Sequence, residues 1–168
     1  MRTLIQIIKW PYLAIKSSIL CCKYPFLRIR TIEGKPIEKI PTMTFLDDFP
    51  KGWRKAFGIE MCKELRRELK HCGDIKALRI YDVKEKYGEL SISADCPYTS
   101  IYDILGKYEY ISYRTCIRCG RRAKYVTQSW VESYCEDCVP KNKETVQFYE
   151  DENWYGYLNF KPKEHEQE

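Results

Sequence analysis

Residues 116–138 read CIRCGRRAKYVTQSWVESYCEDC and contain two C-x2-C pairs separated by fifteen residues. The pairs are Cys116/Cys119 and Cys135/Cys138. Two short cysteine pairs at this spacing are typical of structural zinc sites, in which four sulfurs surround one ion at about 2.3 Å. Gly120 directly follows the first pair, where a tight turn often needs a positive φ that glycine adopts freely. The stretch therefore predicts one structural zinc ion held by four thiolates.

Other uses of these cysteines compete with zinc. A redox C-x-x-C motif normally belongs to a thioredoxin-like βαβ pattern, which the surrounding sequence lacks. An iron site of rubredoxin type would use the same four sulfurs, but the second pair lacks the trailing glycine that such sites usually carry. Disulfides need an oxidising compartment, whereas nine cysteines, an odd number, and no convincing signal peptide favour a reducing one. We therefore expect free thiols and a cytoplasmic location, with the redox and iron sites as open alternatives.

Length and composition suit one compact domain with appendages. The chain has 168 residues, of which 44% are hydrophobic, enough for an ordinary core. The sequence gives little support for a catalytic histidine, because His71 and His165 lie far from the cysteine pairs in the sequence. The net charge is +5, but residues 1–50 carry eight Lys/Arg against four Asp/Glu, and residues 144–168 carry two against seven. The front of the chain is thus basic and the tail acidic.

Residues 1–41 read as an apolar, cationic N-terminal segment followed by a linker. A transmembrane helix wants about 20 predominantly apolar residues, and cations interrupt every such run within residues 1–30. Two interpretations remain open. The segment could lie on an anionic membrane surface as an amphipathic helix, or it could form a helix and an extended arm that pack on the rest of the protein. Adjacent Cys21 and Cys22 are expected to be small buried apolar residues.

Residues 42–143 are predicted to form the zinc-stabilised domain. Apolar residues at steps of three and four predict a helix from Lys51 to His71, which Gly73 ends. Its acids and cations alternate along the sequence, so we expect a solvated face instead of a stripe of one sign.

Strands and a second helix follow. Alternating apolar residues predict strands at 77–83 and 89–94, and helical spacing returns from Ile101 to Ile111. Residues 124–127 and 128–134 can form a hairpin beside the metal. The predicted fold is therefore α+β, with a helix, a β-hairpin, a helix and a four-cysteine treble-clef or zinc-ribbon-like unit. The treble clef is favoured if residues 136–143 begin a short helix.

Residues 144–168 are predicted to be an aromatic and acidic tail. Residues 154–160 contain several aromatic side chains and are expected to form a strand or arm that folds back on the core. The last eight residues, KPKEHEQE, are too polar to pack and are expected to be disordered.

Several of these features together resemble a known family. The run Glu85-Lys86-Tyr87-Gly88-Glu89-Leu90, then CIRCG, Trp130 and YCEDC are similar to the pattern K-E-K-[FY]-G-x-L, C-x-x-C-G and W-x-x-x-x-C-x-x-C of small uncharacterised proteins from bacteria and their phages. The likeness covers roughly residues 53–138, and the upstream GWRKAFG segment adds to it. The resemblance implies a bacterial or phage setting and a zinc-bound fold with a helix and hairpin attached. It implies no activity and no catalytic residues.

Three classes of function then compete. The first is a zinc-stabilised interaction module, not an enzyme, that binds a protein partner or nucleic acid through a basic and aromatic surface around the first cysteine pair. The candidate contacts are Arg118, Arg121, Arg122, Lys124, Tyr125 and Trp130. Alternatively, these arginines only compensate the charge of four thiolates around one Zn²⁺.

The second class is a metal-dependent, nuclease-like enzyme. Four sulfurs would leave the zinc no open position for water or substrate, so a site would have to come from carboxylates such as Asp82, Glu85 and Glu89. The third class is a membrane-surface adaptor anchored by residues 1–30, which is compatible with the first.

Overall fold

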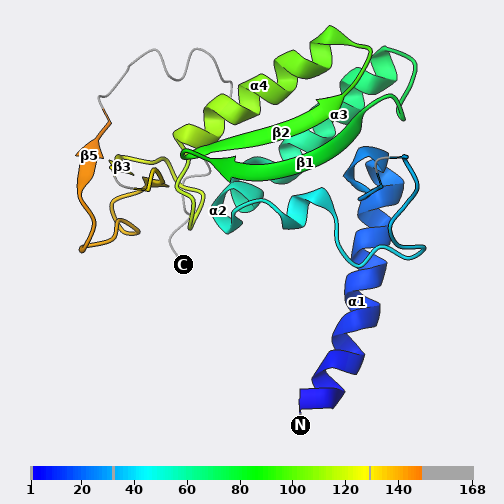
Figure 1. Ribbon diagram of the computed structural model, residues 1–168, viewed down its shortest axis with the longest axis horizontal. Coiled ribbons are helices and arrows are strands. Elements are labelled where there is room, and N and C mark those ends of the chain that lie inside the picture. Colours follow the sequence, from blue (N-terminus) through cyan, green and yellow to red (C-terminus); the bar gives the residue numbers. More distant parts are fainter. Residues whose placement is uncertain (1, 32, 129, 149–168) are drawn as a thin grey trace, which may run out of the picture.

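The computed structural model describes residues 2–31, 33–128 and 130–148, and gives only the backbone path for residues 2–10. The predicted α+β fold is confirmed: helices pack with a two-stranded and a three-stranded antiparallel sheet (Figure 1). The predicted aromatic arm at 154–160, the polar C-terminus and His165 lie outside the described residues.

The first helix, α1 (Arg2–Lys23), extends away from the other elements toward its N-terminus (Figure 1). Its C-terminal half packs on the protein: Ala14, Ser17 and Cys21 are buried, and the Ser17 hydroxyl donates to the carbonyl oxygen of Thr42 (3.0 Å). The burial of Cys21 is confirmed. Cys22 is exposed, so its predicted burial is wrong, because successive residues point about 100° apart around a helix.

A continuous helix was predicted from Lys51 to His71, and the structure divides it. A short 3₁₀ turn, η2 (Phe45–Asp47), precedes α2 (Lys51–Trp53), a π-helical segment η3 (Arg54–Gly58) and α3 (Ile59–His71). Gly73 ends α3 as predicted, with φ +86°. The N–H of Asp74 donates to the Leu69 carbonyl and that of Gly73 to the Lys70 carbonyl, which is the Schellman arrangement.

The predicted strands form a longer hairpin than the sequence suggests. Strand β1 (Arg79–Lys86) pairs antiparallel with β2 (Glu89–Asp95), and only Tyr87 and Gly88 connect them. Both have positive φ, 53° and 82°, as a type I′ turn requires. The second predicted helix is α4 (Thr99–Tyr113), which packs on β2 and α3. Its Ser112 hydroxyl accepts the N–H of Leu90 (2.7 Å).

The main core lies between this hairpin, α3 and α4, and the N-terminal elements contribute to it. Tyr24 and the 3₁₀ turn η1 (Pro25–Leu27) supply buried rings and a leucine from the segment that sequence analysis placed outside the domain. The largest fully buried side chains of this core include Trp53, Tyr24, Phe57, Leu27, Leu46, Met61, Leu65, Leu69, Leu90, Ile101 and Ile111.

The cysteine pairs belong to a second, smaller sheet at the end of the molecule opposite the N-terminus of α1 (Figure 1). The predicted hairpin is present as β3 (Tyr125–Thr127) and β4 (Ser133–Tyr134), and β5 (Thr145–Gln147) adds to the far edge of β3. Strand β5 falls in the stretch predicted to be a separate tail.

Residues 136–143 form turns and not a helix, so the condition that favoured the treble clef is not met. The N–H groups of Cys138 and Val139 both donate to the carbonyl oxygen of Cys135, which closes a single turn. Pro140 biases Val139 toward extended backbone, so the turn does not continue as a helix. The arrangement is consistent with a zinc-ribbon-like unit.

Candidate metal centre and its surroundings

The first cysteine pair lies in a tight turn between α4 and β3. The N–H of Gly120 donates to the carbonyl oxygen of Cys116 (2.9 Å), and the N–H of Cys116 donates to that of Arg121 (2.7 Å). Gly120 has a φ of +84°, which confirms the conformation expected for the residue after the pair. The turn brings the sulfurs of Cys116 and Cys119 together.

The second cysteine pair follows β4 and turns without a glycine. The N–H groups of Cys138 and Val139 both donate to the carbonyl oxygen of Cys135, each at 3.1 Å. A hydrogen bond from the Ile117 N–H to the Ser133 carbonyl (2.9 Å) links the two turns. Backbone hydrogen bonds thus hold the first turn against β4, which leads directly into the second pair.

The four sulfurs form one cluster. The Sγ atoms of Cys116, Cys119, Cys135 and Cys138 all lie within 4.8 Å of one another, and those of Cys119 and Cys135 are 3.5 Å apart. A tetrahedral ion with metal–sulfur bonds of about 2.3 Å separates its ligands by about 3.8 Å, so the cluster has a suitable size. All nine cysteines are free of disulfides. The four thiols could hold one metal ion, and a soft donor set of four sulfurs fits the predicted zinc.

Arg121 supplies positive charge directly at the cluster. Its Nε donates to the Cys119 sulfur (3.4 Å), and its guanidinium forms an ion pair with Asp137 (2.5 Å). Burial by itself would raise the pKa of Cys119, but hydrogen bonds with the Arg121 side chain and backbone, together with those from Cys135 and Cys116, lower that pKa to about 6. Burial, with a contribution from Cys119, raises the pKa of Cys135 to about 12. A bound metal ion would deprotonate its thiol ligands outright.

The first cysteine turn also packs on the start of α2, far away in the sequence. The N–H of Gly52 donates to the Ile117 carbonyl (2.9 Å), and the Trp53 indole donates to the Thr115 carbonyl (3.0 Å). A Cβ on Gly52 would lie 2.1 Å from the Cys116 carbonyl oxygen, and one on Gly120 would lie 2.6 Å from that of Gly52. The two glycines thus permit backbone-to-backbone contact between the first cysteine turn and the start of α2.

Comparison with known proteins gives no relative from which to transfer a function. No protein-family model, no curated protein and no solved structure matches this chain. The chemistry of the site therefore has to be inferred from its own residues.

The predicted basic surface is partly neutralised by neighbouring groups. Besides the Arg121–Asp137 pair, Lys124 forms an ion pair with Glu136 (2.8 Å), and the Arg118 guanidinium lies 5.5 Å from the centre of the Tyr134 ring. Arg122 pairs through its backbone with Thr115, and Tyr125 is half-buried in β3. The structure thus brings these residues near the cysteine cluster, where described carboxylates pair with two of the four cations.

Of the two aromatic residues among the predicted contacts, Trp130 is 65% exposed, whereas Tyr125 is half-buried. Tyr134, in β4, is instead buried together with Cys116 and Cys135. The loop that carries Trp130 is fixed by Thr127, whose hydroxyl donates to the Trp130 carbonyl and accepts the N–H of Glu132 (3.0 Å). The Trp130 ring is therefore exposed to solvent next to these two hydrogen bonds.

A second exposed aromatic residue, which the sequence did not single out, lies close to this loop. Tyr87 is 76% exposed at the tip of the β1–β2 hairpin. Its neighbour Gly88 is so close to the loop that an added Cβ would meet Val131 at 2.9 Å. Because Val131 follows Trp130, the tip of the β1–β2 hairpin and the β3–β4 hairpin present two exposed aromatic residues on adjoining segments. The K-E-K-Y-G run was the available signal: Glu85 accepts the Gly88 N–H (2.7 Å) and fixes the turn.

The carboxylates considered for catalysis do not form a site. Asp82 pairs with Lys84 (2.5 Å), Glu85 is engaged by the turn, and Glu89 is exposed at the start of β2. His71 is exposed at the end of α3, away from the cysteines in the sequence. Asp82, Glu85 and Glu89 thus act in the turn and on the surface of the β1–β2 hairpin.

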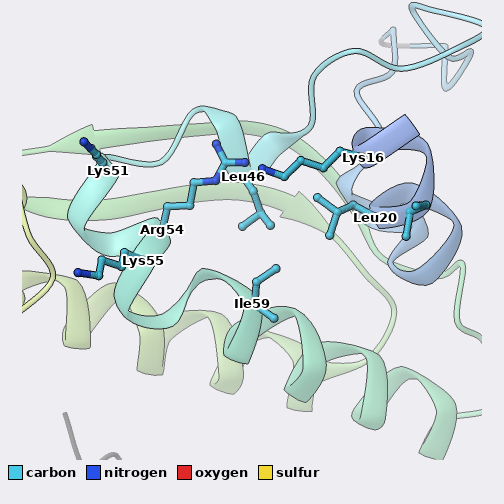
Figure 2. Close-up of a pocket in the computed structure, with 8 residues that line it drawn as sticks. Lys16, Leu20, Leu46, Lys51, Arg54, Lys55 and Ile59 are labelled. Carbon is cyan, nitrogen blue, oxygen red and sulfur yellow. The ribbon is translucent and has the colours of Figure 1, made fainter. Parts of the chain in front are cut away.

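An apolar groove separates α1 from the helices that follow it (Figure 2). Figure 2 shows Leu20, Leu46 and Ile59 between cationic side chains that come from both sides of the groove. The cations are Lys16, Lys51, Arg54 and Lys55. Arg54 is already paired with Asp47 (2.5 Å). Among the described helices, none has the length and apolar character that crossing a bilayer requires.

Proposed function

We propose that this protein is an interaction module whose smaller sheet is closed by one structural zinc ion. The observation that carries the proposal is the cluster of four sulfurs within 4.8 Å, supplied by two turns that hydrogen-bond to each other. Four thiolates fill a tetrahedral shell, so the ion would stabilise structure and not activate water. The resemblance of the hairpin and cysteine motifs to small bacterial and phage proteins supports a bacterial or phage setting. The nine free thiols suit a reducing compartment such as the cytoplasm.

The need for a metal follows from how little apolar core this part of the chain has. Its buried hydrophobic cluster contains only Cys116, Tyr134 and Cys135 among the described residues, whereas the main core draws on every helix from η1 to α4. A unit this small generally needs a metal or disulfides to fold. Structural zinc supplies on the order of 10–16 kcal/mol in small peptides, which is ample for this purpose.

Metal analysis tests the zinc assignment. Purified protein should contain about one zinc per chain, and Cys135→Ser should reduce the metal content and lower the thermal midpoint. Cys22→Ser is the matched control, because Cys22 is exposed on α1 and should affect neither quantity. Less than half an equivalent of zinc in a folded preparation, or full stability of Cys135→Ser, would contradict the proposal.

The partner-binding surface is proposed to be the aromatic pair Tyr87 and Trp130. Exposed aromatic residues on ordered segments are enriched at protein interfaces and often contribute much of the binding energy. Tyr87 also keeps a positive φ, which a residue with a Cβ adopts only at an energetic cost and which is often found at functional sites. A protein partner is favoured over nucleic acid because the surrounding cations are mostly paired with acids or rings.

A photo-crosslinking amino acid tests this surface in cells. Placed at Tyr87 or Trp130 it should yield the same discrete crosslinked species, whereas at Tyr81, an exposed tyrosine on β1, it should yield none of it. Equal crosslinking from all three positions would reject the surface. Single-stranded DNA binding that falls steeply with salt and is lost in Arg118→Ala/Arg122→Ala would instead favour a nucleic-acid partner.

Membrane-surface attachment is the second candidate, favoured by the exposed face of α1. Tyr12, Ile15 and Ile19 are exposed on the side of the helix opposite to buried Ala14 and Cys21. The first thirty residues carry six cations and no acid, which suits an anionic surface.

Vesicle flotation distinguishes this candidate from the first. Full-length protein should float with vesicles containing anionic lipid, and Ile15→Glu/Ile19→Glu should prevent it. Ile37→Glu is the control, because Ile37 is equally exposed but lies in the linker. Failure of the intact chain to float would remove the candidate without affecting the zinc proposal.

A further inference from the structure

A second, strongly cationic pocket lies between the end of α1 and α3, away from the cysteine cluster. It has a volume of about 320 Å³, at the lower end of the range typical of ligand pockets. Its lining residues are Lys23, Tyr24, Lys63, Arg66, Arg67 and Lys70. No carboxylate is among these described lining residues. Five cations around one hollow repel one another, and a bound anion would relieve this repulsion.

The charges of α3 that alternate in the sequence separate in space. Lys63, Arg66, Arg67 and Lys70 stand at i, i+3, i+4 and i+7, so they share one face of the helix. Glu64 points instead to α4, where it accepts hydrogen bonds from Lys107 (2.5 Å) and Tyr108 (2.9 Å). The expectation that this helix carries no stripe of one sign is therefore wrong at the pocket.

Two of the acids remain near this helix face without cancelling its charge. Glu60 pairs with Lys63 (2.9 Å) on the exposed surface, and Glu68 accepts a weak hydrogen bond from Cys72 (3.8 Å). Neither lines the pocket. After the Glu60 pair is counted, four cations are left without a partner carboxylate in the described contacts.

Two buried polar atoms of the pocket residues lack hydrogen-bond partners. They are the Tyr24 hydroxyl, on a side chain that is only 1% exposed, and Nε of Arg66. The Tyr24 ring lies beneath the Lys23 ammonium at 5.5 Å, and both residues line the pocket. Buried polar atoms are nearly always satisfied, and both of these atoms carry protons to donate. What is missing is an acceptor.

We propose that this pocket binds a phosphate group. Four cations without a carboxylate call for a negatively charged acceptor, and a phosphate dianion offers several acceptor oxygens to the planar guanidinium groups of Arg66 and Arg67. A single carboxylate would leave most of the positive charge uncompensated. The phosphate can come from a free phosphorylated small molecule or from a lipid headgroup, since the adjoining α1 also has an exposed apolar face.

Binding measurements on the full-length, metal-loaded chain test the site with two probes. Inorganic pyrophosphate is titrated calorimetrically, and vesicles of phosphatidylcholine are compared with vesicles that also contain a phosphoinositide. Binding of pyrophosphate alone identifies a free phosphorylated ligand, and binding of phosphoinositide vesicles alone identifies a lipid headgroup. Both outcomes support the phosphate site, provided that the variants below remove them.

Charge-matched variants show whether the pocket is responsible. Arg66→Gln/Arg67→Gln should weaken binding at least roughly tenfold, because each removes charge-assisted hydrogen bonds. Arg79→Gln/Lys76→Gln makes the same charge change at positions outside the pocket and should leave binding nearly unchanged. Equal loss in both pairs, or no binding of either probe at about 150 mM salt, a concentration at which exposed charges are strongly screened, would overturn the proposal.

Tyr24→Phe separates a ligand role from a structural one. It removes only an unsatisfied hydroxyl, so stability should be unchanged or slightly higher while affinity for the probe falls. A loss of stability without a loss of affinity would show that the hydroxyl serves the fold, and would contradict its assignment to the ligand.

Discussion

Gly120 and Gly73 have nearly the same backbone angle, φ +84° and +86°, in different surroundings. An added Cβ on Gly73 would meet nothing within 4 Å, whereas one on Gly120 would lie 2.6 Å from the Gly52 carbonyl oxygen. Gly73→Ala should therefore cost only the left-handed backbone strain, about 1–2 kcal/mol. Gly120→Ala should cost about 1–3 kcal/mol more because the cysteine turn must also move from α2. Urea unfolding of both variants checks the difference, and equal losses would contradict the contact.

The exposure and the pKa of each cysteine predict how fast its thiol reacts. Cys22 is exposed, whereas burial raises the pKa of Cys62 to about 12. Because the thiolate is the reactive form, iodoacetamide at neutral pH should modify Cys62 slower than Cys22 by on the order of 100-fold or more. The four clustered cysteines should become reactive only after chelation. Mass spectrometric mapping with and without chelator measures this, and rapid labelling of Cys135 in metal-loaded protein would be incompatible with ligation.

At the scale of elements, α3 and α4 are joined by a polar contact as well as by apolar packing. The Tyr108 hydroxyl donates to Glu64 (2.9 Å), which also accepts from Lys107, and the Tyr108 ring lies 5.6 Å from that of Phe57. Tyr108→Phe keeps the ring but removes a hydrogen bond to a charged group. We expect a loss of about 1.5–3 kcal/mol, measurable by chemical denaturation.

The same residue predicts how stability depends on pH. Burial, followed by the hydrogen bond to Glu64, raises the pKa of Tyr108 well above its ordinary value of 10.0. The free energy of unfolding that Tyr108 contributes is fully present below about pH 10. It decreases above that pH, because the unfolded chain then releases a proton that the folded protein retains. Tyr108→Phe should flatten the decrease between about pH 10 and pH 11, whereas Tyr81→Phe should not. Parallel curves for all three proteins would refute the assignment.

Element types could be predicted from the sequence, but their details depended on contacts between distant residues. Periodicity predicted the helix over 51–71 and the alternation of the hairpin, since both reflect burial of one face. It could not show the π-helical turn at Arg54–Gly58, which lies where Gly52 and Gly58 pack closely on Ile117 and Leu46.

For the candidate sites too, local patterns could be predicted from the sequence, whereas contacts between distant residues could not. The cysteine cluster was predictable because its ligands follow a fixed local spacing. The ion pairs that neutralise Arg121 and Lys124, and the turning of Glu64 toward α4, required three-dimensional placement. Strand β5 was missed because three residues give too short an alternation to recognise. It is held instead by pairing with β3 and by Phe148, which packs against Tyr113 and Arg114.

For the whole molecule, two buried clusters of unequal size imply two levels of stability. The main core contains most of the large buried side chains, and the cysteine unit has almost none without its metal. Chelation at neutral pH should therefore abolish hydrogen-exchange protection in residues 114–148 and leave most of the protection in α3 and α4. Readdition of zinc should restore it. Simultaneous loss of protection throughout the protein would show that the two parts unfold as one.

The contact between Gly52 and Gly120 also places a constraint on evolution. Neither position can gain a side chain while the other element stays where it is, since each Cβ would enter backbone of the opposite segment. In related sequences we expect these two positions to be glycine together, or to change together with a lengthened turn after the first cysteine pair. An alignment of such sequences would thus test the contact between α2 and the first cysteine turn without any measurement on the protein itself.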